Sequence, residues 1–333
     1  MGKELSVKDI AEMAGVSIAT VSRVINQNGR FSKETEERVK KIIEEYDFHP
    51  NQLARGLRVS KVRVIGILVP DITNEFFAMI ILELQKILMT YGYLTLICNN
   101  NEDERIENEQ MDMLLGQKVS GIIYVGGRGI AKIRKGLPFV CIDRRPVSAG
   151  AESEVPYCLI ESDNVKGGRL AAEELYGRQC RNVCVVSYNQ EISAYKDRVE
   201  GFMQAMRSHG IEPMLCIAEY MNHYNEGENM MEELLEENPG LDGVFFTTDY
   251  LALGGLRSLA RRKIPVPGKV KVIGYDDISL CENVFPALTT IRQNVKQMAE
   301  QAADLLISLV NHETVSRDAI SKIDVELISR ETT

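Results

Sequence analysis

The spacing of apolar residues in the first fifty positions predicts three short helices. The first covers residues 7–14, where apolar side chains fall at positions i, i+3, i+4 and i+7. The second covers residues 17–26 with Ser17 as its N-cap, and the third begins at Ser32. The positions expected to be buried among these helices are Val7, Ile10, Ala11, Ala14, Val21, Val24, Val39, Ile42, Ile43 and Tyr46.

The join between the first two helices indicates a DNA-binding motif. Gly15 lies there, and glycine readily adopts the left-handed conformation that a tight turn needs. Two helices joined in this way form a helix-turn-helix, which presents its second helix to the major groove. The alternative is a helical hairpin in another kind of domain, with Arg23 as a solvated surface residue.

The outer face of the second helix carries residue types that suit DNA. Arg23 can donate two hydrogen bonds to a guanine, and Ile18 and Ala19 can contact a thymine methyl group. The hydroxyls of Thr20 and Ser22 suit phosphate oxygens, which position the protein without specifying sequence.

A second DNA-contacting segment is predicted at residues 51–58, NQLARGLR. Asn51 can cap a short helix in which Leu53, Ala54 and Leu57 share one side, flanked by Arg55 and Arg58. So short a helix is marginal alone in water, but it could form in a minor groove with a leucine wedged between base steps. The alternative is a plain interdomain linker.

From Val62 onward, short β-rich runs alternate with helical stretches, which predicts an α/β body of two doubly wound lobes with parallel sheets. The fold class is therefore an all-α head followed by this α/β body. Ligands of such sheets bind at the carboxyl ends of the strands. The residues expected at those ends are Asp71, Asn74, Asp143, Thr248, Asp249, Asp276 and Asp277.

The charge distribution is compatible with DNA binding, although the net charge is −9. Residues 1–63 carry a net charge of +3, and the remaining residues carry a net charge of −12. The basic character therefore lies in the segment that is predicted to bind DNA. The seven cysteines are scattered without zinc-site spacing, and we expect reduced thiols and no metal. Neither a signal peptide nor a membrane span is visible, which favours a cytoplasmic protein.

Motifs for catalysis are missing from the sequence. GGRG at 126–129 lacks both the GxGxxG spacing and the lysine of a phosphate loop, and the four histidines are scattered. We therefore expect a protein that is not an enzyme and needs no cofactor. A plain solute-binding protein would account for the body but would leave residues 1–60 unexplained.

Six segments of the chain resemble the LacI/GalR family of bacterial transcription regulators. In chain order they are VKDIAEMAGVSIATVSRVIN, HPNQLARGLR, VIGILVPDITNEFF, GIIYVGG, DRVEGFMQAM and PALTTIRQ. The resemblance covers essentially the whole chain. It implies a homodimer that binds a pseudo-palindromic operator, with Ile18 and Ala19 reading bases and Leu57 entering the minor groove at a central CG step. Ile18 is unusual at its position. The chain stops at ELISRETT, which favours a dimer over a tetramer.

The same resemblance implies a body like a periplasmic binding protein of type I, with a small-molecule effector held between its lobes. The expected domains are residues 1–49, a hinge at 50–61, a first lobe of 62–160 plus about 290–320, and a second lobe of 161–289 plus about 321–333. The effector residues expected are Asn74, Phe76, Phe77, Asp143, Arg198, Thr248, Asp249 and Asp276.

The residue types of that expected site favour a sugar or a sugar-like polyol. Carboxylates accept hydrogen bonds from hydroxyls, and phenylalanine covers apolar ring edges. Two alternatives stay open at this point. Arg144, Arg145 and Arg198 could pair with a phosphorylated metabolite or purine, and a phosphoprotein corepressor could replace the small molecule.

Overall fold

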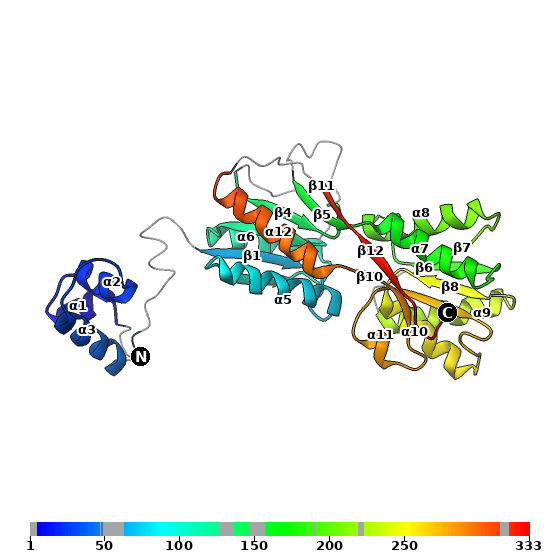
Figure 1. Cartoon of the computed structure of the whole chain (residues 1–333), viewed down its shortest axis with the longest axis horizontal. Coiled ribbons are helices and arrows are strands. Elements are labelled where there is room, and N and C mark those ends of the chain that lie inside the picture. Colours follow the sequence, from blue (N-terminus) through cyan, green and yellow to red (C-terminus); the bar gives the residue numbers. More distant parts are fainter. Residues whose placement is uncertain are drawn as a thin grey trace. The chain divides into compact units, whose positions relative to one another are not determined.

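The computed structural model describes residues 5–46, 48, 63–126, 136–146, 157–189, 191–218, 223–313 and 320–333. The chain divides after Val62 into two compact units, which we call the head, Met1–Val62, and the body, Arg63–Thr333 (Figure 1). Each unit has a hydrophobic core of its own.

The head contains the three predicted helices, α1 (Val7–Ala14), α2 (Ile18–Asn26) and α3 (Lys33–Glu45). Each starts at a serine N-cap whose hydroxyl accepts a backbone N–H: Ser6 for α1, Ser17 for α2 and Ser32 for α3. Gly15 has a φ of 64°, which confirms the left-handed turn after α1. The buried core of the head is formed by Ile10, Ala11, Ala14, Val21, Val24, Val39 and Phe48.

One predicted core position of the head is wrong. Tyr46 is 49% exposed, because it is the C-cap of α3, where the helical spacing of side chains ends. Phe48 fills the core in its place, although it was not expected there.

The first lobe of the body is a six-stranded sheet in which all described neighbours are parallel. Helices α5 (Glu75–Thr90) and α12 (Val295–Val310) share one hydrophobic core with one face of the sheet, and α6 (Glu104–Gly116) packs Leu114 against Gly66 on the other. The strand order is β11 (Ile320–Ile323), β5 (Cys158–Ser162), β4 (Phe139–Ile142), β3 (Gly121–Val125), β1 (Val64–Val69) and β2 (Leu94–Asn99).

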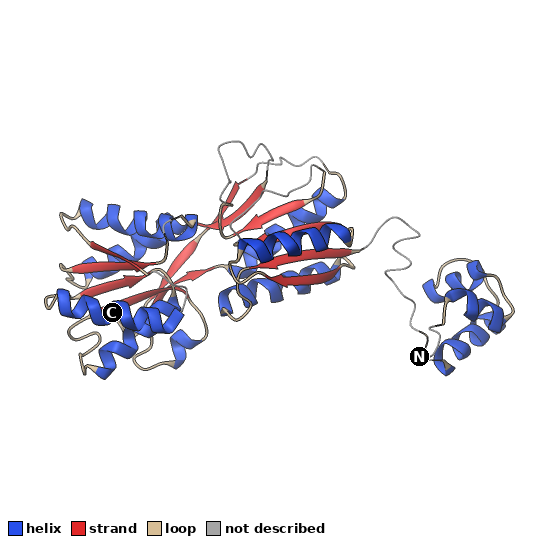
Figure 2. Cartoon of the chain, turned by 180° about the vertical axis from the view of Figure 1, so that it is seen from behind, coloured by secondary structure: helices blue, strands red, loops and turns tan. Residues whose placement is uncertain are grey.

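The second lobe is also a six-stranded sheet, with helices on both faces (Figure 2). Helices α7 (Asn164–Gly177) and α8 (Ser193–Ser208) cover one face, α9 (His223–Glu237) and α10 (Asp249–Arg261) the other, and α11 (Leu280–Asn283) follows β9. The strand order is β12 (Val325–Ile328), β10 (Thr289–Gln293), β9 (Lys271–Asp276), β8 (Gly243–Phe246), β6 (Val183–Ser187) and β7 (Met214–Ile217). The β10–β12 pair is antiparallel, so this sheet is not wholly parallel as predicted.

The chain passes between the lobes at three places, because each of β5, β10 and β11 is followed at once by an element of the other lobe. These crossings lie at Asp163, Asn294 and Asp324, a few residues beyond the expected lobe borders of 160, 290 and 320. The periodicity of the sequence did not single out β5, β7, β10, β11 or β12, and all of these strands except β7 contain polar residues. No described helix is both long and apolar enough to cross a membrane.

Candidate DNA interface and effector site

The outer face of α2 is exposed as expected. Ile18 is 41% exposed, and the side chains of Ala19, Ser22 and Arg23 are also accessible to solvent. Val21 and Val24 turn the opposite face into the core. The structure therefore presents the predicted base-contacting residues together on one helical face.

Two hydroxyls of this face also serve the helix itself. Ser17 Oγ accepts the Thr20 N–H at 3.1 Å, and its hydroxyl lies 2.9 Å from Thr20 Oγ1. Both residues therefore define where α2 begins, in addition to any phosphate contact. The predicted hinge residues Asn51, Leu53, Ala54, Arg55 and Leu57 lie outside the described residues.

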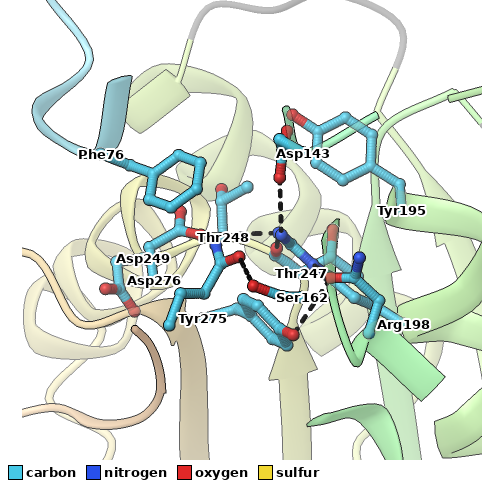
Figure 3. Close-up of polar contacts among 12 residues, drawn as sticks. Phe76, Asp143, Ser162, Tyr195, Arg198, Thr247, Thr248, Asp249, Tyr275 and Asp276 are labelled. Carbon is cyan, nitrogen blue, oxygen red and sulfur yellow. Dashed lines mark hydrogen bonds and ion pairs between the residues drawn. The ribbon is translucent and has the colours of Figure 1, made fainter. Parts of the chain in front are cut away.

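In the body, the predicted site residues meet at Arg198, where the two lobes join (Figure 3). Arg198 Nε donates to Asn164 Oδ1 at 2.8 Å, and Nη1 donates to the Thr247 carbonyl at 2.8 Å. Asp276 Oδ1 lies 3.6 Å from Nη1, and Asp143 Oδ1, from the first lobe, lies 3.9 Å from Nη2. The guanidinium also lies 3.7 Å from the ring centre of Tyr275.

Close crossing of two helices holds Arg198 in this position. A Cβ atom on Gly168 of α7 would lie 2.0 Å from the Arg198 carbonyl oxygen, and one on Gly201 of α8 would lie 2.0 Å from the Val165 carbonyl oxygen. Any larger residue would push α7 and α8 apart and separate Arg198 from Asn164 at the start of α7.

Both site carboxylates follow strands in strained backbone. Asp143 has a φ of 74° after β4, and Asp276 has a φ of 120° at the end of β9. Such angles cost a residue with a side chain about 1–3 kcal/mol and cluster at functional sites. Gln293 Nε2 donates to Asp276 Oδ1 at 2.7 Å, and Gln293 Oε1 accepts from Ser162 Oγ at 2.6 Å, which links the strand ends of both lobes.

Burial dominates the electrostatics of these carboxylates. It raises the pKa of Asp143, and the positive charges of Arg144 and Arg198 partly offset this rise. It raises the pKa of Asp276 well above its ordinary value; Arg198 opposes this rise, and the nearby charges of Asp249 and Asp143 add to it. The site therefore brings two buried carboxylates close to the guanidinium groups of Arg198 and Arg144.

Three arginines lie at this junction, and each is already paired. Arg144 donates to Glu102 Oε1 at 2.8 Å, to the Gly126 carbonyl at 3.0 Å and to the Tyr195 hydroxyl at 3.1 Å. Arg145 Nη2 donates to Asp197 at 2.6 Å and to Glu161 at 3.0 Å. The bonds to Tyr195 and Asp197 join the first lobe to α8 of the second, and the other three lie within the first lobe.

The other predicted effector residues divide into three groups. Phe76 and Phe77 are buried, and the Phe77 ring centre lies 5.4 Å from the Arg144 guanidinium. Asn74 and Thr248 are N-caps of α5 and α10. Asp249 is fully buried, and its two oxygens accept from Ile278 N at 2.9 Å and Thr290 Oγ1 at 2.5 Å, so its carboxylate supports the β9 and β10 ends.

Several residues of the junction were not predicted as effector contacts, namely Ser162, Asn164, Tyr195, Tyr275, Gln293 and Glu102. Ser162 and Gln293 end β5 and β10, and Asn164 begins α7 directly after β5. The rule that ligands meet strand ends would have located these three if β5 and β10 had been recognised.

Comparison with known proteins places this geometry in a family. Residues 62–331 match the profile of periplasmic binding proteins and the sugar-binding domain of the LacI family, and residues 6–51 match that of bacterial regulatory proteins of the lacI family. The chain belongs to the LacI family. This LacI-family chain is accordingly a DNA-binding regulator of transcription.

Curated relatives extend the likeness along the whole chain. The ribose operon repressors of Halalkalibacterium halodurans and Bacillus subtilis are 30% and 31% identical, over 98% of this chain and 97% and 98% of their own lengths. A periplasmic binding protein/LacI transcriptional regulator from Alkaliphilus metalliredigens, complexed with D-xylulofuranose, is 28% identical with a TM-score of 0.73, over 82% of this chain and 99% of that one. The lac repressor dimer bound to operator has the same fold, with a TM-score of 0.87 at 22% identity over 99% of both chains.

Proposed function

We propose that this LacI-family regulator is a cytoplasmic repressor that binds a pseudo-palindromic operator as a homodimer, and that a neutral sugar of pentose size, bound at the Arg198 junction, controls its operator affinity. It acts by binding alone, without catalysis. One arrangement of the lobes favours operator binding and another does not. An effector can control operator affinity only if it binds these two arrangements with different affinities.

The observation that carries the sugar assignment is that the junction's cations are occupied. Arg198, Arg144 and Arg145 each have carboxylate or carbonyl partners, so a phosphate would have to displace them. Asp143 and Asp276 would in addition repel an anion, whereas they accept hydrogen bonds from hydroxyl groups. The junction therefore favours a neutral polyol over a phosphorylated metabolite.

The size of the sugar is supported by the relatives. Three of the curated relatives are named ribose operon repressors, and the similar regulator from Alkaliphilus metalliredigens is complexed with a five-carbon sugar. A sucrose operon repressor and two transcriptional repressors named PurR are also among the relatives, at 31% and 29% identity, so the test includes a disaccharide and, for the purine alternative, a nucleobase.

The proposal is tested by calorimetry of the full chain with D-ribose, D-xylulose, sucrose, ribose 5-phosphate and hypoxanthine, followed by operator binding with each ligand. We expect a pentose to bind best and to change operator affinity. Tighter binding of ribose 5-phosphate or hypoxanthine would contradict the neutral-sugar assignment. A response to a phosphoprotein and to none of the small molecules would indicate a protein corepressor.

Homodimer formation is supported by an apolar edge on the first lobe. Strand β2 is the edge strand of its sheet, and an exposed edge strand of this kind normally pairs or is covered. We call the following exposed residues on β2, α5 and α6 the β2 patch: Met89, Leu94, Leu96, Ile97 and Met113.

A further inference from the structure

Glu102 lies in a loop whose backbone directs its side chain inward. Asn101 and Glu102, between β2 and α6, have φ angles of 52° and 57°, and neither is a glycine. Asn100 Oδ1 accepts the Glu102 N–H at 2.9 Å and holds this conformation. The Glu102 side chain is only 15% exposed. Two consecutive left-handed residues are costly, and the surroundings must hold them in place.

The inward carboxylate uses only one of its two oxygens. Oε1 accepts from Arg144 Nη1 at 2.8 Å. Oε2 is buried and has no hydrogen-bond partner among the described residues. A buried carboxylate oxygen without a donor is unfavourable, so a bound group that supplies one stabilises this arrangement.

Two further unsatisfied atoms lie on the neighbouring residues. Arg144 Nε and Asp143 Oδ1 are buried and likewise lack hydrogen-bond partners in the described part of the chain. Glu102 bonds to Arg144, and Asp143 Oδ2 lies 3.3 Å from Arg144 Nε, so the three residues form one cluster. Because Arg144 Nε faces the Asp143 carboxylate, the cluster offers two acceptors, Glu102 Oε2 and Asp143 Oδ1, which suit hydroxyl groups as donors.

We propose that Glu102 is a specificity-determining residue for the effector, whose free Oε2 accepts a hydrogen bond from one particular sugar hydroxyl. The inference rests on the proposed function, because it requires a polyol at the Arg198 junction. A site built to bond a hydroxyl discriminates strongly against an analogue without it, since the buried acceptor is then left unpaired. Glu102 thereby selects among sugars of one size.

The test compares D-ribose with its 1-, 2-, 3- and 5-deoxy derivatives by calorimetry, on the full-length wild type and on Glu102→Ala and Glu102→Gln. In the wild type, we expect one deoxy derivative to bind at least about tenfold more weakly than ribose through loss of this bond. In Glu102→Ala that penalty falls to about twofold, while the penalties for the other derivatives stay as they were.

The matched control is Glu109→Gln on α6, whose exposed carboxylate pairs with Arg105 and should leave every penalty unchanged. Thermal unfolding without sugar checks that each variant folds, and Glu102→Gln, which keeps the shape of the side chain, decides the test if Glu102→Ala does not fold.

Two results would overturn the proposal in different ways. In the first, the Glu102 variants bind ribose and all its deoxy derivatives more weakly by the same factor, so every affinity ratio between ribose and a derivative stays as in the wild type. Glu102 then acts only by holding Arg144, or a water molecule occupies Oε2, and the proposal is wrong. If the wild type binds none of the pentoses, the proposed pentose function fails, and this inference fails with it.

Discussion

Glu75 of the first lobe and Ser279 of the second are joined by two hydrogen bonds to one carboxylate. The Ser279 N–H donates to Glu75 Oε1 at 2.8 Å, and its hydroxyl lies 3.0 Å from Oε2. The Glu75 N–H also donates to the Tyr250 hydroxyl at 3.2 Å. Arg144 and Arg145 join the lobes through α8, so the lobes are linked at a second place as well.

We expect Glu75→Ala to weaken effector binding about fivefold to tenfold, because it removes bonds that favour the lobe arrangement around the site. Calorimetry with the effector measures the change. Glu83→Ala is the control, since Glu83 is on the same helix and pairs only with Lys86 in the described contacts. Equal affinities of Glu75→Ala and the wild type would show that the Glu75–Ser279 bonds do not contribute to closure.

Asp276→Asn should abolish the effector response without lowering stability at neutral pH. The folded state raises the pKa of Asp276, so ionising this buried carboxyl costs stability, and Arg198 keeps Asp143 as a partner in the variant. We expect its Tm at about pH 7 to equal or exceed that of the wild type by a few degrees.

The pH dependence of this difference has a definite sign. As pH falls through the raised pKa of Asp276 toward its ordinary value of 3.8, the folded wild type binds a proton that the unfolded chain does not yet bind. The wild type therefore gains stability relative to Asp276→Asn on acidification. A large loss of Tm in the variant at neutral pH would instead mean that Arg198 needs both carboxylates.

Arg23→Ala should weaken binding to the specific operator about tenfold to a hundredfold, because we predict that Arg23 makes a bidentate base contact. Binding to unrelated DNA should fall much less, since that depends on phosphate contacts. Arg38→Ala on α3 removes the same charge elsewhere in the head and serves as the control. Fluorescence anisotropy with both kinds of DNA measures the ratio, and an unchanged ratio for Arg23→Ala would reject its base contact.

Replacing Leu94 and Leu96 with lysine should convert the dimer to a monomer, because it introduces charges into the β2 patch. Sedimentation analysis of the full chain measures the mass. The matched control replaces Leu215 and Ile217, which are exposed apolar residues on β7, the edge strand of the other sheet. A dimer that survives in the β2 variant but not in the β7 variant would place the interface on the second lobe.

Local sequence signals were sufficient for the head. Serine caps at Ser17 and Ser32 and the left-handed turn at Gly15 act within a few residues, so α1, α2 and α3 could be predicted almost to their ends. Tyr46 was misplaced because helical spacing does not reveal the residue at which a helix stops. In the body, the predominantly apolar strands were found, whereas β5 and β10, which carry polar side chains such as Glu161 and Arg292, were missed.

The sequence by itself determined the fold class, the exposed face of α2 and the carboxylates at the strand ends, because these depend on periodicity and residue type. Only the tertiary structure decided which of those residues meet. Asp143 and Arg198 come from different lobes, and each oxygen of Asp249 accepts a hydrogen bond, one from Ile278 and one from Thr290. The free oxygen of Glu102 depends on backbone angles and on burial by distant segments, and no local pattern of residues encodes these.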